Sequence, residues 1–243
     1  MQFSYSRTTL LTIDEPVVAP KGLVYSTSPR RAEGDNGRSY FIKGHESNET
    51  IFAEIGGCIL ANAVGLPVPA VALCDFEDTY FAGSEDLRGI RDVSAWLWER
   101  DKIENVEDLL RVVALDTWLA NTDRNWGNLI GEPCGHEKIR LFFIDFEKSV
   151  VLRPLPLMRT AEVESNELWP RGQLGSLIRG WGFLHPPQDI MRKIAEFNLE
   201  HCRELLSPPA TAIGIDWLDS ACDALSRRSA QIQTLVEDVW SSR

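Results

Sequence analysis

The feature that most constrains this chain is a group of polar residues at the ends of apolar segments between positions 115 and 145. The stretch LDTWLANTDRNWGNLIG, which begins at residue 115, sets four of them among apolar neighbours: Asp116, Asp123, Arg124 and Asn128. Further along, the apolar run LFFI leads directly into Asp145. Buried polar groups need hydrogen bonds, ion pairs or metal ions. The fold therefore has to bring these side chains to shared partners.

Length and composition favour a single globular domain over residues 1–243, with enough apolar material for two lobes that share a cleft. Hydrophobic residues make up 44% of the 243 positions, which suffices for a sizeable core. No apolar run is long enough to cross a membrane, and an acidic residue interrupts the N-terminal stretch where a signal peptide would be apolar. We expect a cytoplasmic protein that does not contact membranes.

Charge and cysteine content narrow the function classes further. The net charge of -11 argues against nonspecific nucleic-acid binding, because that binding depends on Lys and Arg neutralising phosphates. The five cysteines are odd in number and widely spaced. We therefore expect reduced thiols in the core, not disulfides or a zinc site.

Strand signals dominate the first part of the chain. Residues 9–43 alternate apolar runs with turn signals, which predicts a small antiparallel sheet with the flexible basic tip SPRRAEGDNGR between two strands. A helix is expected at residues 48–64, capped by Ser47 or Asn48, and VPAVALCDF reads as a further strand.

Helix signals dominate the rest. The pattern predicts a helix at residues 105–120 with Asn105 as its cap, and further helices at 188–206 and 216–240. Between them, NLI and IRLFFID read as two strands of a hairpin. The expected fold class is α+β with two lobes, a strand-rich N-terminal lobe over residues 1–75 and a mainly helical C-terminal lobe over residues 76–243.

The hairpin suggests a metal site. If its loop is centred near residues 136 and 137, Asn128 and Asp145 fall opposite each other, and directly opposed residues have Cβ atoms about 5 Å apart. An amide oxygen and a carboxylate at that spacing suit Mg²⁺. Asp123, five residues before Asn128, lies in the loop that enters the hairpin. Asp-x-x-x-x-Asn followed by a strand that ends in Asp is a phosphotransferase pattern of one base and two metal ligands.

The first part of the chain contains matching phosphate-binding candidates. Lys43 ends the strand SYFIK, and Glu54 lies on the next helix, where it can orient the ammonium group. The tip before Lys43 offers backbone N–H groups at Ser26, Thr27 and Ser28 to nucleotide phosphates, together with Arg30, Arg31 or Arg38.

Four segments resemble the bacterial HipA-like kinases, especially the short single-chain members, and more remotely the phosphatidylinositol kinase branch. These segments are FIKG, FAEIGGCILANAVGLPVPAVAL, ALDTWLANTDRNWGNLI and FFIDFEKS, within residues 22–150. The resemblance implies a protein-kinase-like fold that uses ATP and Mg²⁺. It implies that Lys43 holds phosphates and Glu54 orients Lys43. It also implies that Asp123 is the base or positions the acceptor hydroxyl, and that Asn128 and Asp145 bind the metal.

Two departures from the common kinase pattern stand out. Asn121, Thr122 and Asp123 occupy the place of His-Arg-Asp, and DFE replaces Asp-Phe-Gly. Regulation by a flipping glycine segment therefore does not carry over. Taken singly, Lys43 could also be a surface lysine, and Glu54 could be a solvated glutamate. We expect Asp116 to hold the loop around Asn121–Arg124 by hydrogen bonds, and Arg124 either to pair with a carboxylate or to reach the substrate.

The expected function is transfer of the γ-phosphate of ATP to a hydroxyl acceptor, a protein Ser or Thr. A small-molecule or lipid kinase and a nucleotide-binding pseudokinase are the alternatives. We expect residues 146–188 to shape the acceptor site. The acceptor, the oligomeric state and self-phosphorylation at Ser26, Thr27 or Ser28 stay open at this stage.

Overall fold

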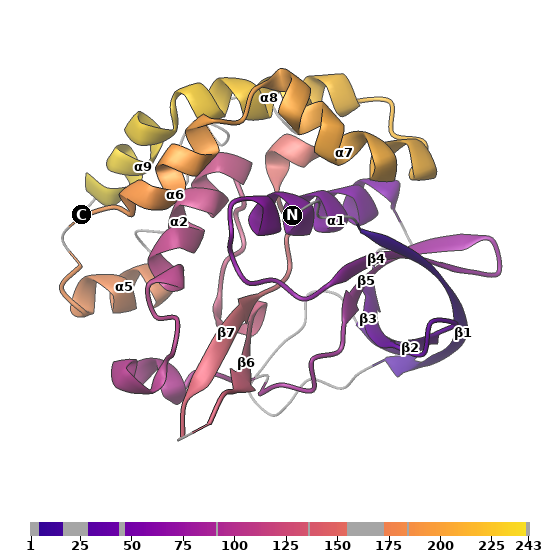
Figure 1. The fold of residues 1–243 in the computed structure, drawn as a ribbon, viewed down its shortest axis with the longest axis horizontal. Coiled ribbons are helices and arrows are strands. Elements are labelled where there is room, and N and C mark those ends of the chain that lie inside the picture. The colour runs from indigo at the N-terminus through magenta and orange to yellow at the C-terminus, as the bar shows by residue number, and fades with distance from the viewer. Residues whose placement is uncertain are drawn as a thin grey trace.

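A computed structural model describes residues 5–16, 29–43, 47–90, 92–135, 137–154, 173–183 and 185–241. Five strands near the N-terminus form a closed barrel, and helices cover one side of it (Figure 1). The predicted strand-rich front and helical back are both present. Ser26, Thr27 and Ser28, and the strand predicted at GLVYST, lie outside the described residues.

The barrel strands follow the order β1-β2-β3-β5-β4. Their bounds are β1 Ser6–Pro16, β2 Arg30–Gly34, β3 Ser39–Lys43, β4 Val71–Phe76 and β5 Thr79–Glu85. Neighbours pair antiparallel except β1 and β4, whose parallel pairing closes the barrel. A small core fills the interior, with Leu10, Ala32, Tyr40, Ile42, Ala72, Cys74 and Phe81. Gly83 leaves room for it, since a Cβ there would lie 2.4 Å from the Cys74 sulfur.

The predicted basic tip is wrong for residues 30–34, which form strand β2. Ala32 and Gly34 are buried while Arg31 and Glu33 are only partly so, the alternation of a half-buried strand. The turn between β2 and β3 is therefore confined to residues 35–38. Arg31 forms an ion pair with Asp86 at 3.3 Å, and Arg38 forms one with Glu85 at 3.1 Å. Both arginines thus have carboxylate partners on or beside β5.

Helix α1, Asn48–Ala63, lies between the barrel and the C-terminal helices (Figure 1). The prediction is confirmed, including Ser47 as N-cap, whose side chain accepts a hydrogen bond from the Thr50 N–H. Every residue from Ile51 to Ala61 is buried, because α1 contacts β4 and β5 on one side and α7 on the other. A polar side chain on this stretch has to find its partner inside the protein.

Helix α2, Asp108–Leu119, begins three residues later than predicted. The predicted cap at Asn105 is wrong, because the N-cap residue is Glu107. The Asn105 amide bonds to the Asp108 carboxylate at 2.8 Å and to both backbone groups of Leu141. Asn105 therefore ties the start of α2 to the hairpin.

The hairpin consists of β6 Leu129–Pro133 and β7 Ile139–Phe143. Leu129 pairs with Phe143 and Pro133 with Ile139, which puts the centre at residue 136. The predicted facing of Asn128 and Asp145 is therefore wrong by one residue. Asn128 lies across from Ile144, whose N–H donates to the Asn128 carbonyl at 3.1 Å. The turn has one residue fewer than the prediction assumed, and Asp145 follows the paired region.

The C-terminal helices are α5 Gln173–Gly180, α6 Gln188–Ala195, α7 Leu199–Ile213, α8 Leu218–Ala230 and α9 Ile232–Ser241. Each of the two long helices predicted here is divided. Asn198 starts α7 by accepting the His201 N–H at 2.9 Å, and a break at Gln231 separates α8 from α9.

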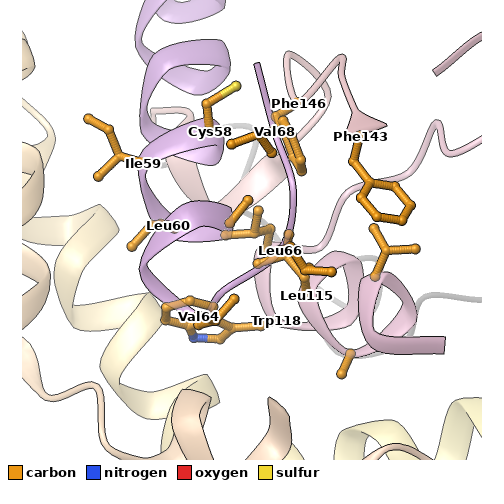
Figure 2. Packing of buried hydrophobic residues seen from close by; sticks show 14 of the residues in the cluster. Cys58, Ile59, Leu60, Val64, Leu66, Val68, Leu115, Trp118, Phe143 and Phe146 are labelled. Atoms are coloured by element: carbon orange, nitrogen blue, oxygen red, sulfur yellow. The ribbon is translucent and has the colours of Figure 1, made fainter. Parts of the chain in front are cut away.

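One main core runs from the outer face of the barrel through α1 and α2 to the C-terminal helices. Figure 2 shows the part of it where Leu60 of α1 lies near Leu115 and Trp118 of α2. Barrel strand β5, Thr79–Glu85, lies entirely beyond residue 75. The division into lobes at residue 75 stays a prediction. Four of the five cysteines are buried, as expected for core thiols, and Cys134 is exposed. In the part of the chain that the structure describes, no helix combines the length and the apolar character needed to cross a bilayer.

Arg228 offers a test of how the C-terminal helices hold α2. Its buried guanidinium donates to the carbonyls of Thr117 and Trp118 at the end of α2. Arg228→Met should lower the free energy of unfolding by about 2–4 kcal/mol, because buried acceptors lose charged donors. Arg227→Met, which removes an exposed pair with Asp223, should change it little. Urea unfolding measures both; equal midpoints for the two variants would contradict this role.

Candidate active site

Lys43, Glu54 and Asp145 meet at the centre of the site, although they come from β3, α1 and the end of the hairpin. The Lys43 ammonium lies 3.5 Å from Glu54 Oε2 and 2.9 Å from Asp145 Oδ1. The predicted pairing of Lys43 with Glu54 is present in the structure. The direct contact with Asp145 was not predicted.

Burial and charge act in opposite directions on this group. Burial lowers the pKa of Lys43, but the carboxylates of Glu54, Asp145 and Glu147 outweigh it and raise that pKa above its ordinary value. Burial raises the pKa of Glu54, and Lys43 offsets only part of that rise. The ammonium group is thus held firmly in its charged form.

Glu54 also fixes the chain next to Asp145. Its Oε2 accepts the Phe146 N–H at 2.7 Å. The Phe146 side chain lies in the core on the side of Cys58 and Val68 (Figure 2). It packs directly on Gly57, where a Cβ would lie only 2.3 Å from the Phe146 Cβ. The glycine at this position therefore permits the close approach that brings the Phe146 N–H to Glu54.

A buried ion pair organises the loop that carries Asp123. Asp116, fully buried on α2, accepts from Arg124 Nε at 2.9 Å and Nη2 at 3.0 Å, and from the Asn121 amide at 2.9 Å. The expected structural role of Asp116 agrees with these contacts. Of the two possibilities for Arg124, the structure shows the carboxylate pair.

Arg124 also connects this loop to the segment after the hairpin. Its Nη1 donates to the Ile144 carbonyl at 2.6 Å, and its guanidinium lies 4.8 Å from the centre of the Phe146 ring. Asp145 adopts a left-handed backbone conformation, φ 67°, which is uncommon outside glycine, although Asp is among the residues that tolerate it. Because of this bend, Asp145 does not continue the extended backbone of strand β7.

Asn128 and Asp123 are linked through the loop backbone. The Asn128 amide donates to the Asp123 carbonyl at 2.6 Å, which leaves its side-chain oxygen as the group available to a ligand. Among the described residues, the Asp123 carboxylate accepts a hydrogen bond only from Asn125, at 3.2 Å, and it is partly exposed. A base or an acceptor-positioning group needs this kind of access.

The donors fit a hard divalent cation. Asn128 and Asp145 offer an amide oxygen and the carboxylate oxygen that does not face Lys43, and Mg²⁺ prefers such oxygens. Across the described ranges, no three His, Cys, Asp or Glu side chains converge as a metal-binding group. A metal here would therefore depend on few protein ligands, the usual situation for Mg²⁺ held together with phosphates.

Sequence reasoning missed three features of the site: the contact of Asp145 with Lys43, the role of Gly57 and the burial of Glu147. The pair Gly56–Gly57 inside an otherwise apolar helix was a signal for the second of these, since glycine in a helix interior is destabilising unless space requires it. For Glu147, only the unusual DFE motif gave a hint.

Gly56 and Gly57 provide a matched test. At Gly56 a new Cβ would meet only the ends of two leucine side chains, Leu206 at 3.2 Å and Leu152 at 3.4 Å. Gly56→Ala should thus be neutral or stabilising by up to about 1 kcal/mol through helix propensity. Gly57→Ala should destabilise by about 1–3 kcal/mol, because it forces Phe146 and the attached segment to move. The two unfolding midpoints decide this, and similar midpoints would remove Gly57 from its positioning role.

Comparison with known proteins bears on the fold. No family model matches the chain, and no curated protein does. The Helicobacter pylori proinflammatory kinase CtkA aligns with a TM-score of 0.48 and 13% identity over 88% of this chain and 93% of that one. HipA of the Shewanella oneidensis MR-1 toxin–antitoxin system, solved with HipB and operator DNA, aligns with a TM-score of 0.53 and 11% identity, covering 95% of this chain and 68% of that one. At that identity the likeness concerns the fold, and the chain has the fold of a HipA-like kinase.

Proposed function

We propose that the protein is an ATP- and Mg²⁺-dependent kinase that phosphorylates a hydroxyl group, most specifically a Ser or Thr of another protein. One observation carries the proposal. Within a HipA-like kinase fold, Lys43 is held by Glu54 and Asp145 next to the loop that presents Asp123 and Asn128. Phosphoryl transfer needs a fixed cation, metal ligands and a group that positions the nucleophile.

Each residue has a role in this proposal. Lys43 binds nucleotide phosphates, since its ammonium is charged and fixed by two carboxylates. Asn128 and Asp145 would hold Mg²⁺, which neutralises charge on the phosphates when bound. Asp123 orients the acceptor hydroxyl and accepts its proton as the oxygen forms its bond to phosphorus. The bond from the γ-phosphorus to the bridging oxygen breaks, and ADP leaves with that oxygen.

The acceptor is proposed to be a protein because of surface charge and the residues beyond the hairpin. A net charge of -11 disfavours an anionic lipid surface. Near the end of α5, Arg100 lies 4.4 Å from the centre of the Phe183 ring, and Trp181 contacts Phe183 edge to face. Such mixed aromatic and cationic surfaces suit an extended peptide. We place the protein in the cytoplasm, with a regulatory or toxin-like role.

Asp123→Asn tests the chemistry. Turnover should fall by about 10² to 10⁴, the usual contribution of a positioned general base, while the fold stays intact. The assay follows labelled phosphate from ATP into proteins of a bacterial lysate, with Asp101→Asn, at an exposed position, as the control variant. Near-wild-type transfer by Asp123→Asn would remove this residue from catalysis.

Metal binding is tested separately by thermal unfolding. With ATP and Mg²⁺ at about a hundred times the dissociation constant, the wild type should gain about 2.7 kcal/mol, which corresponds to a rise in Tm of about 5–10 °C. Asp145→Asn should lose most of the Mg²⁺-dependent part of the rise. Asp123→Asn should keep it, because Asp123 faces the acceptor. A wild type that shows no rise with ATP, with or without Mg²⁺, would contradict the proposed function.

A further inference from the structure

Buried polar atoms without a hydrogen-bond partner are concentrated in one place. In the described part of the chain, all but one of them belong to Glu54 or to residues 145–149; the exception is Arg31 Nε. Those of Glu54 and Glu147 are carboxylate oxygens, which only accept hydrogen bonds. Asp145 Oδ1 differs from them, because it faces the Lys43 ammonium at 2.9 Å. Such groups are rare in folded proteins and call for an explanation. What this region lacks is donors or a cation.

Glu147 is the least compensated of these side chains. The residue is 1% exposed, and neither carboxylate oxygen has a hydrogen-bond partner. Among the described residues, the cation paired with it is Lys148, whose Nζ lies 3.4 Å from Oε1 on a side chain that is 40% exposed. Arg153 is close, but it donates to the Glu147 backbone carbonyl, at 2.8 and 3.1 Å. Burying a carboxylate on these terms costs several kcal/mol.

The surroundings of Glu147 are already rich in negative charge. Three carboxylates, of Glu54, Asp145 and Glu147, act on the Lys43 ammonium. With the Lys148 ammonium beside Glu147 included, the formal charge of the group is 2 − 3 = −1. Arg124 does not change this sum, because Asp116 neutralises it. A net negative charge would repel nucleotide phosphates. The arrangement becomes favourable for phosphate binding once a divalent cation is present.

We propose that Glu147 supplies a second carboxylate, with Asp145, to a divalent-cation site in the proposed active site. The two residues lie two positions apart on the segment that Glu54 and Arg124 hold in place. Two carboxylates, with water and phosphate oxygens completing the shell, match the habits of Mg²⁺. The inference rests on the proposed function, since it assigns a further residue to the same site.

If Glu147 had a purely structural role, replacing it would leave the affinity for the metal unchanged. Removing an unpartnered buried charge should stabilise the metal-free protein in either case. Only a metal ligand also changes the response to a cation. Stability without metal and affinity for metal therefore have to be measured on the same variants.

The experiment uses Mn²⁺ as the probe, because its bound and free forms are distinguished by electron paramagnetic resonance. The full chain is titrated with Mn²⁺ alone and with ATP. Glu147→Gln keeps the shape of the side chain and should weaken Mn²⁺ binding about tenfold or more, with an equal or higher metal-free Tm. Glu137→Gln, which removes a charge from an exposed turn position, should bind Mn²⁺ as the wild type does.

A third variant keeps the test decisive if Glu147→Gln folds poorly. Glu147→Asp retains the charge on a shorter side chain and should bind Mn²⁺ more tightly than Glu147→Gln. Wild-type Mn²⁺ affinity in Glu147→Gln, or equal weakening in the Gln and Asp variants, overturns the role of Glu147. Absence of any ATP effect in the wild type contradicts the proposed kinase function instead, so the two failures are distinguishable.

Discussion

The rest of the structure depends on the contacts that the Glu54 carboxylate makes. Glu54 lies on the stretch of α1 that is buried on all sides, from Ile51 to Ala61, so its charge must be matched inside the protein. One of its oxygens meets both the Lys43 ammonium and the Phe146 N–H. A single side chain thereby sets the distance between the barrel, helix α1 and the segment of Asp145. Replacing it would release three elements together.

The buried pair of Asp116 and Arg124 does the same for the loop of Asp123. Arg124 contacts Asp116 through two nitrogens and reaches the Ile144 carbonyl with a third. Planar guanidinium groups hold such geometry better than lysine can. The loop and the end of the hairpin therefore move as one unit, which fixes Asn128 relative to Asp145. Both anchoring pairs converge on Phe146, whose N–H bonds Glu54 and whose ring lies under Arg124.

Sequence reasoning predicted the parts of the site that depend on local pattern. Helix periodicity placed Glu54 on the correct face, and the strand pattern put Lys43 at a strand end beside it. The sequence-based prediction was wrong for the hairpin register, which depends on one residue of turn length. A shift by one residue turns a side chain to the other face of the strand. The prediction also missed β2, because polar residues on the outer face of a barrel strand look like a loop. The burial of Glu147 depends on tertiary packing and leaves no periodic trace.

The parallel pairing of β1 with β4 has a consequence for how the protein folds. One edge of β1 pairs with β2, but the other pairs with β4, Ser6 with Ala72 and Thr9 with Asp75, so this second edge waits for a partner that comes after helix α1 in the chain. Contacts of such sequence separation slow folding, because a long loop has to close before this pairing is gained. During synthesis the barrel can close only after β4 and β5 have left the ribosome. Until then β1 has an open edge, and the nascent chain is at its most vulnerable to wrong strand pairing.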